Sequence, residues 1–265
     1  MDEAIEINPF SASSLFVEMM FNEVVLACGT AFYYCCDGTI YLVSNWHNFS
    51  GRHPETKKSL HSQLAVPNKI KIHGHNLTNL SIPEIHIYNL LDDENGCTWF
   101  EHPILKSLID VAVLPVPKNN FNTFDISSAI NAIDPYGNSP VEVGDRLFVL
   151  GFPFGISGTC NLPIWKVASL ASEPALDQEN LPLLYIDTAT RQGMSGSPVI
   201  SYRRRTVMFG DGQRCWSKFH STFVGVYSGR ITPKDQLEAQ LGKVWKAHCI
   251  EEIIKGASCP VFYDI

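Results

Sequence analysis

A serine in the segment RQGMSGSPVI, residues 191–200, has neighbours that suit it to nucleophilic chemistry. A serine hydroxyl is a weak nucleophile, so Ser195 would need a base, an acid that orients the base, and donors for a developing oxyanion. Gly193 can adopt a backbone conformation closed to other residues, and its N–H and that of Ser195 can converge on such an oxyanion. Gly, Ser and Pro also fill ordinary turns. The segment alone therefore leaves a nucleophile and a plain turn serine both open.

Two other residues can complete a Ser-His-Asp arrangement. In GTAFYYCCDGTIYLVSNWHNFSGR, residues 29–52, two strands joined by a tight turn end at His47, which places the imidazole at the rim of a sheet. In LIDVAVLPV, residues 108–116, Asp110 leads into an apolar strand, so its carboxylate is desolvated and needs donors. The Nδ1–H of His47 is one such donor. The pair would leave Nε2 of His47 free to take the Ser195 proton.

The elements that must position these residues are short strands. Hydrophobic alternation and β-branched residues predict strands, which Gly and Pro separate. They cover 24–34, 39–44, 69–73, 84–88, 97–100 and 111–116, then 146–152, 183–187, 197–201 and 222–229. A weaker helix is predicted over 13–20. A C-terminal helix is predicted from an N-cap at Thr232 to about Ile254.

Two groups of about six strands with little helix between them predict an all-β fold of two antiparallel barrels or sandwiches. Residues 117–140 are rich in Asn, Ser and Pro, and we interpret them as the connection between the two halves. The predicted domains are an N-terminal extension, a barrel carrying His47 and Asp110, a barrel carrying Ser195, and a C-terminal helix and tail. They cover 1–23, 24–125, 126–231 and 232–265.

Composition and charge exclude several classes of protein. The 265 residues carry a formal net charge of -7, so no general basic field favours nucleic acid. Residues 203–230 are locally basic, which predicts a solvated hairpin; a docking patch for an acidic partner is the alternative. The N-terminal residues MDEAIEINPF do not resemble a signal peptide, and no apolar run is long enough to cross a bilayer. We therefore expect a cytoplasmic protein, without membrane or nucleic-acid partners, whose eight cysteines are reduced.

Six motifs in order carry a resemblance to a known family. They are GTAF, SNWH, DVAVL, VGDRLFVLGFPFG, RQGMSGSPV and GVYSG, spread over about residues 24–230. Together they resemble the trypsin-like (chymotrypsin-fold) serine peptidases, in particular bacterial stand-alone domains and the protease domain of the high-temperature-requirement proteins. The resemblance implies two six-stranded β-barrels with the catalytic site between them. It also implies a triad of His47, Asp110 and Ser195, with Gly193 and Ser195 forming the oxyanion hole. Trp46 departs from the family, in which a smaller residue precedes the histidine.

The same resemblance implies a substrate-binding pocket. By offset from the serine, Ala189 would form the floor of the S1 pocket, with Thr190 beside it. Ser228, Gly229 and Arg230 would line the strand that pairs with the substrate backbone. An alanine floor predicts a small or medium apolar P1 side chain, and Arg230 turned inward would instead favour an acidic one.

The sequence thus predicts a serine endopeptidase that acts through an acyl-enzyme without a metal or organic cofactor. Its substrates would be proteins or peptides, in a narrow range or under control of a regulatory partner. The alternative is a catalytically silent trypsin-like fold that serves as a protein-binding module. An α/β-hydrolase is disfavoured, because position 197 is Ser where its G-x-S-x-G motif needs Gly. A zinc site at His73 and His75 is disfavoured, because no two further ligands are obvious.

Overall fold

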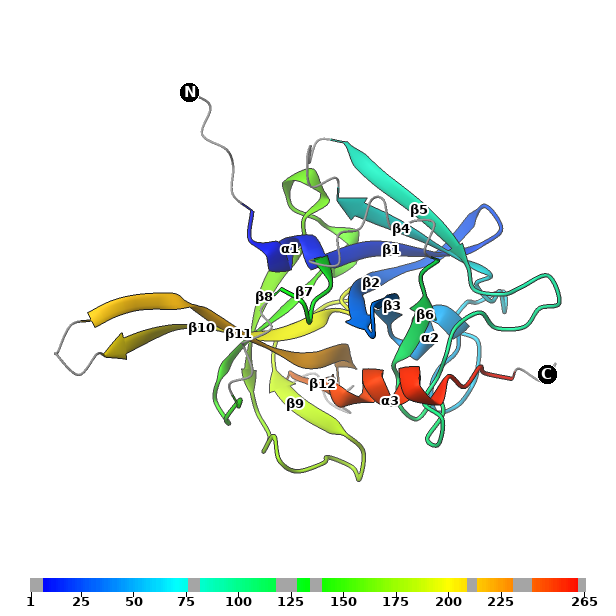
Figure 1. The fold of residues 1–265 in the computed structure, drawn as a ribbon. Helices are drawn as coiled ribbons and strands as arrows, with labels where there is room; N and C mark the ends of the chain where they lie inside the picture. The colour runs from blue at the N-terminus through cyan, green and yellow to red at the C-terminus, as the bar shows by residue number, and fades with distance from the viewer. Residues whose placement is uncertain are drawn as a thin grey trace.

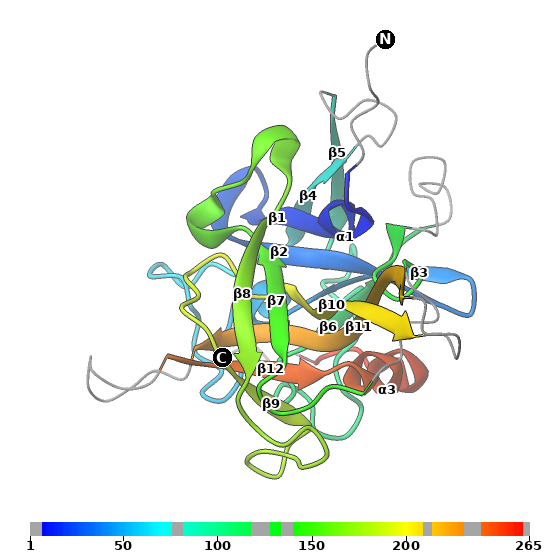
Figure 2. The ribbon, with the colours of Figure 1, turned by 90° about the vertical axis from the view of Figure 1, so that its left-hand side faces the viewer.

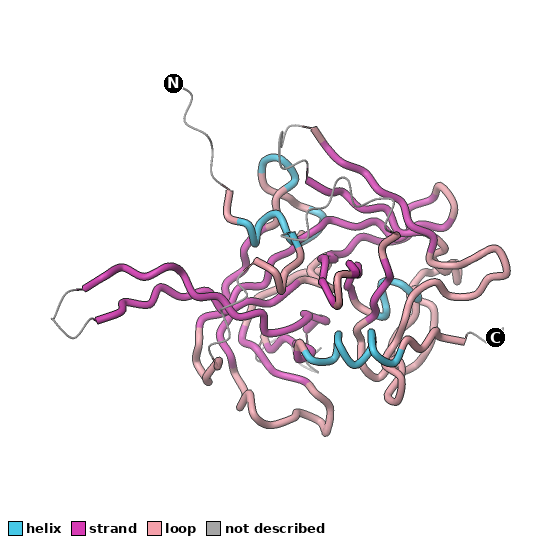
Figure 3. Tube along the Cα trace, in the orientation of Figure 1, coloured by secondary structure: helices cyan, strands magenta, loops and turns pink. Residues whose placement is uncertain are grey.

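Two six-stranded antiparallel sheets, which lie against each other, make up most of the protein (Figures 1 and 3). The strand order of the first sheet is β5-β4-β1-β2-β3-β6, and the second closes into a barrel in the order β10-β11-β12-β9-β8-β7. The computed structural model describes residues 7–75, 82–117, 128–133, 140–208, 214–230 and 240–261, with the backbone alone at 83, 204–208 and 214–220.

The first sheet contains β1 (Ser14–Phe21), β2 (Val24–Cys36), β3 (Thr39–Ser44), β4 (Lys69–His75), β5 (Pro83–Asn89) and β6 (Ala112–Pro115). The short helix α1 (Pro9–Ser13) precedes it, and α2 (Trp46–Ser50) follows β3. The predicted turn between β2 and β3 is confirmed. Asp37 and Gly38 both have positive φ angles, 48° and 72°, which a two-residue hairpin loop of this hand requires.

The closed barrel contains β7 (Arg146–Gly151), β8 (Ile164–Leu170), β9 (Leu183–Asp187), β10 (Pro198–Met208), β11 (Arg214–Arg230) and β12 (Leu241–Lys246). Figure 2 shows β7 and β8 running side by side on one wall of this barrel. Two 3₁₀ turns, Pro153–Gly155 and Thr159–Asn161, lie between them in sequence, and α3 (His248–Gly256) follows β12. The described outer parts of β10 and β11 project from the barrel as a two-stranded arm (Figure 1).

The hydrophobic core forms three clusters. One fills the first sheet around Leu42 and Ile72, and one fills the barrel around Val149 and Val244. The third joins the two sheets, and Ile253 of α3 belongs to it. Apolar side chains from both sheets thus pack together, which holds the sheets in one arrangement.

The predicted all-β fold with two groups of six strands and a C-terminal helix is confirmed. In the described strands the first group is an open sheet, because its edge strands β5 and β6 do not pair with each other. Residues 97–100 were predicted to be a strand, but they make only isolated bridges at Cys97 and Phe100. The predicted boundary between the two barrels, near residue 125, lies outside the described residues and stays a prediction.

One helix prediction is wrong, and the predicted C-terminal helix is wrong in its first part. Residues 14–21 form β1, which pairs with both β2 and β4, so tertiary pairing overrides the local preference of its Leu, Glu and Met residues. Residues 241–246 form β12, which pairs with β11 and β9 and closes the barrel. The C-terminal helix therefore begins at His248. The predicted N-cap Thr232 lies outside the described residues.

None of the described helices is long and apolar enough to cross a membrane.

Candidate active site

His47 is the second residue of α2, and this helix follows the buried end of β3. Asn45 precedes the helix, and Gly51 ends it with φ 63° and an N–H that donates to the His47 carbonyl at 2.9 Å. This positive φ favours glycine, and a side chain at Gly51 would also collide with Pro67. The one-turn helix thus holds His47 in a defined place at the rim of the first sheet.

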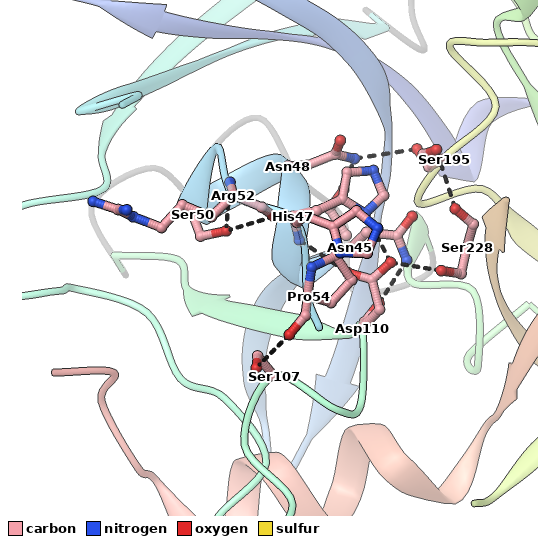
Figure 4. Close-up of polar contacts among 12 residues, drawn as sticks. Asn45, His47, Asn48, Ser50, Arg52, Pro54, Ser107, Asp110, Ser195 and Ser228 are labelled. Carbon is pink, nitrogen blue, oxygen red and sulfur yellow. Dashed lines mark hydrogen bonds and ion pairs between the residues drawn. The ribbon is translucent and has the colours of Figure 1, made fainter. Parts of the chain in front are cut away.

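Three donors surround the buried carboxylate of Asp110, which precedes β6. Nδ1 of His47 lies 2.7 Å from Oδ2, and the backbone N–H of His47 donates to Oδ1 at 2.9 Å. The Ser228 hydroxyl donates to Oδ2 at 2.5 Å (Figure 4). An ionised carboxylate only accepts, so Nδ1 carries the proton and Nε2 is left as the basic nitrogen. The structure therefore brings the two predicted residues His47 and Asp110 together.

Ser195 lies in the loop before β10, in the closed barrel, and lines one cavity together with His47 and Gly193. Its hydroxyl donates to the Ser228 carbonyl at 3.2 Å (Figure 4). Among the hydrogen bonds of the described residues, none joins Ser195 to His47. Catalytic hydrogen bonds are often loose before substrate binds, so this arrangement does not exclude Ser195 as the nucleophile.

The loop around Ser195 is tied to both sheets through its carbonyl groups. Thr30 of β2 donates its hydroxyl to the Gly193 carbonyl at 2.9 Å and its N–H to the Ser195 carbonyl at 2.9 Å. The N–H of Phe154 donates to the Gln192 carbonyl at 2.7 Å. No hydrogen bond among the described residues uses the N–H groups of Gly193 and Ser195. These two donors are therefore available for an oxyanion.

Gly193 has φ 92°, and a Cβ built on it would lie 2.3 Å from the Phe152 carbonyl oxygen. We expect Gly193→Ala to move this peptide and to lower kcat on a peptide substrate by about 10² to 10³-fold, as loss of one oxyanion donor does. The control is Gly144→Ala, because Gly144 has φ 84° but open space around its missing side chain. Steady-state kinetics and thermal unfolding of both variants test this. Unchanged kcat in folded Gly193→Ala would contradict it.

Thr190, one of the residues predicted to form the S1 pocket, contacts Tyr227, which was not among the predicted pocket residues. Ala189 is half-buried and Thr190 is buried. The Thr190 hydroxyl shares a short hydrogen bond with the Tyr227 hydroxyl. Burial raises the pKa of Tyr227 to about 12, while the charge of Arg230 opposes that rise. A hydrogen-bonded pair of hydroxyl groups thus involves Thr190, the residue that follows the predicted alanine floor in the sequence.

Ser228 occupies a break in the β11–β12 pairing. Tyr227 pairs with Val244 and Gly229 with Lys243, so Ser228 has no partner in the ladder. Such a bulge re-aims a side chain. Here it lets the Ser228 hydroxyl reach Asp110 while its carbonyl accepts from Ser195. The sequence predicted Ser228 only as a substrate-pairing residue, and no local signal marked the bulge.

The unusual tryptophan before His47 packs into the hydrophobic core of the first sheet. Trp46 is buried against Trp99, with ring centroids 6.3 Å apart, and its indole N–H donates to Oε2 of Glu101 at 2.9 Å. Lys57 places its ammonium 4.8 Å from the centroid of the Trp46 ring. Burial raises the pKa of Glu101, opposed by the Trp46 hydrogen bond and by the charges of Lys106 and Lys57. A buried carboxylate therefore anchors the residue adjacent to the candidate base.

Because the folded protein raises the pKa of Glu101 above its ordinary value of 4.5, the folded state binds more protons than the unfolded state above that pH. The contribution of Glu101 to stability therefore falls as pH rises through the raised pKa. We expect Glu101→Gln, which keeps an acceptor for Trp46, to raise Tm at pH 7 and to change it less near pH 4. Glu101→Ala is the control, and loss of the Trp46 acceptor should destabilise it by about 1–3 kcal/mol. A lower Tm for Glu101→Gln than for wild type at pH 7 would contradict the expectation.

Other residues considered in the sequence have ordinary partners. His73 contacts Glu18 at 2.8 Å, and His75 contacts the Ser14 carbonyl at 3.2 Å. In the described part of the chain, no group of three or more His, Cys, Asp or Glu residues could hold a metal ion. In the basic segment, Arg203 forms an ion pair with Asp145. The side chains of its other basic residues before Arg230, namely Arg204, Arg205, Arg214 and Lys218, lie outside the described part.

Comparisons with known proteins agree with this architecture. The family model of the trypsin-like peptidase domain matches residues 29–207. No curated protein matches the chain. Among solved structures, the active form of the Rv3671c protease from M. tuberculosis is similar at 16% identity, with a TM-score of 0.50, over 96% of this chain and 85% of that chain. The serine endoprotease from Yersinia pestis is similar at 12% identity, with a TM-score of 0.52, over 95% of this chain and 67% of that chain. These two likenesses concern the fold, and the match to the family model covers more than half of the sequence: the chain belongs to the trypsin-like peptidase family.

Proposed function

We propose that this protein is a serine endopeptidase that hydrolyses peptide bonds through an acyl-enzyme. The observation that carries the proposal is the buried Asp110, which holds Nδ1 of His47 at 2.7 Å in the cavity wall that also contains Ser195. The backbone N–H groups of Gly193 and Ser195, which have no hydrogen-bond acceptor among the described residues, belong to the same loop. Base, orienting acid, nucleophile and oxyanion donors are thus present at one place.

In the proposed mechanism, the Ser195 hydroxyl leaves the Ser228 carbonyl and gives its proton to Nε2 of His47 as its oxygen attacks the substrate carbonyl. The oxyanion accepts hydrogen bonds from the N–H groups of Gly193 and Ser195. Asp110 stabilises the imidazolium that forms and remains ionised. His47 then returns the proton to the leaving amine, and water hydrolyses the acyl-enzyme by the same steps in reverse order. None of these steps needs a metal or an organic cofactor.

The proposed S1 pocket contains Ala189 and Thr190, with Ser228, Gly229 and Arg230 along the adjoining strand. The alanine floor favours a small or medium apolar P1 side chain, and Arg230 turned inward would instead favour an acidic one. The substrates would be proteins or peptides. A narrow substrate range, control by a regulatory partner and a cytoplasmic location stay predictions from the sequence.

A fluorophosphonate probe tests the proposed function, because it reacts covalently with an activated serine. We expect the wild-type protein to be labelled and Ser195→Ala to remain unlabelled. The control is Ser197→Ala, which removes a neighbouring buried hydroxyl but leaves the nucleophile in place. Equal labelling of wild type and Ser195→Ala would contradict the proposal. No labelling of a folded wild-type protein would favour the alternative, a catalytically silent binding module.

A further inference from the structure

A cavity of about 340 Å³ opens beside Ser195 and is lined by His47, Gly193 and a wall of apolar side chains. The wall comes from the β1–β2 hairpin and from residues 51–67, which connect α2 to β4. Its apolar members are Met19, Leu26, Ala27, Leu60, Ala65 and Pro67. The proposed catalytic chemistry uses none of these side chains.

The lining of the cavity shows on which side of the scissile bond it lies. The proposed function, on which this inference rests, assigns the acyl half of the substrate to Ala189 and Thr190 and to the strand 228–230. None of these residues lines the cavity. His47 does, and this residue must deliver a proton to the leaving amine. The cavity therefore faces the part of the substrate that follows the cleaved bond.

The charge of the lining selects the kind of side chain that can enter. The lining also includes the polar side chains of Asn48, His61 and Gln192, but among the described residues that line the cavity none is Asp, Glu, Lys or Arg. A charged substrate group would lose water here without a carboxylate, ammonium or guanidinium group to pair with. An apolar group would cover apolar surface, including Leu60, whose exposed fraction is 56%. The volume is at the lower end of the range for ligand pockets, which suits one side chain with its backbone.

Backbone contacts hold the wall in place without substrate. The N–H of Leu60 donates to the Gly51 carbonyl at 2.8 Å, and Arg52 and Ser59 form an antiparallel bridge. Gly51 also lies so close to Pro67 that an added Cβ would be 2.5 Å from its ring. Residues 51–60 are thus tied back on α2, and the pocket is preorganised.

We propose that this cavity is a leaving-group subsite that binds an apolar side chain of the size of Leu, Met or Phe on the first residue after the cleaved bond. The same site would bind an incoming amine during the reverse step. In that step the amine nitrogen attacks the acyl-enzyme carbonyl, the bond to Ser195 Oγ breaks, and the amine proton passes through His47 to the serine oxygen.

Acyl transfer tests the subsite separately from the S1 pocket. The enzyme is acylated with a peptide p-nitrophenyl ester, and leucinamide, phenylalaninamide, glycinamide or aspartic acid amide is added as the acceptor. The ratio of aminolysis to hydrolysis measures binding of each acceptor to the acyl-enzyme. We expect leucinamide and phenylalaninamide to exceed glycinamide by about tenfold, because a hydrophobic pocket discriminates on this scale. Aspartic acid amide should give no more transfer than glycinamide.

Variants of the wall complete the test. Leu60→Asp should abolish the preference for leucinamide, and the volume-conserving Leu60→Met should retain it. The matched control is Leu176→Asp, because Leu176 is 60% exposed and does not line the cavity, so its substitution should leave the preference unchanged. Leu60 is exposed as well, so its variants are expected to fold, which thermal unfolding checks.

Two results would overturn the inference. Equal transfer to all four amides, or a leucinamide preference that survives in Leu60→Asp, would show that the cavity does not select the acceptor. Absence of any acyl-enzyme from the ester, read as a mass increase on the protein, would instead overturn the proposed function itself and with it the subsite.

Discussion

Replacing His47 with Ala is expected to lower kcat on a peptide substrate by about 10⁶-fold, and replacing Ser195 as well should lower it no further. The two residues act as one unit, because the serine hydroxyl is unreactive without a base and the base has nothing to activate without the serine. The residual rate should come from substrate binding and from the N–H groups of Gly193 and Ser195. Steady-state kinetics of the two single variants and the double variant measure this.

The control for this cycle is His53→Ala, which removes an exposed imidazole that does not line the cavity. Its kcat should equal that of the wild type. A double variant slower than either single variant by another large factor would show that the two side chains act independently. That result would contradict the proposed mechanism.

Replacing Asp110 with Asn is expected to lower kcat by about 10⁴-fold while the protein stays folded. The hydrogen bonds around Asp110 predict how the amide will lie. The backbone N–H of His47 needs an acceptor, so the amide oxygen should take the Oδ1 position. The amide NH₂ then faces Nδ1 of His47, where Oδ2 was. His47 must accept there, which moves its proton to Nε2 and leaves no base for Ser195.

Ser228→Ala is the matched control for Asp110→Asn, because it removes one donor to Oδ2 but leaves both His47 contacts with the carboxylate. Its loss of kcat should be much smaller. Equal losses in the two variants would show that the carboxylate does not set the imidazole tautomer. Kinetics at pH 7 and unfolding curves of both variants decide between these outcomes.

Local patterns in the chain were sufficient for much of the fold and for the members of the candidate site. The β2–β3 hairpin, the strands β3 and β9 and the division of the strands into two groups follow from alternation and turn residues, which act over a few positions. The count of six strands in the second group came from the family resemblance, because the local pattern did not predict β8 or β12. His47, Asp110 and Ser195 were found because each stands in a short motif, and the motifs occur in a known order. Two of the three lie within hydrogen-bond distance of each other in the structure.

Local patterns failed where distant segments decide the conformation. β1 has neighbours on both sides that come from residues 24–36 and 69–75, and β12 is held by β9 and β11, so neither pairing is visible in the residues of the strand itself. The helical preference of residues 14–21 and the helix-like spacing of Leu241, Val244 and Trp245 were both outweighed by these pairings.

The sequence by itself determined the family and the strand-rich fold and singled out one serine, one histidine and one aspartate as a candidate triad, because these depend on residue identity and order. Only the tertiary structure decided how they are held. Ser228 donates to Asp110 from a bulge, Thr30 of the first sheet holds the Ser195 loop of the second, and Glu101 accepts a hydrogen bond from Trp46, the neighbour of His47. Each of these contacts joins residues far apart in the chain. Hydrogen bonds that form only in the packed tertiary structure cannot be predicted from neighbouring residues in the sequence.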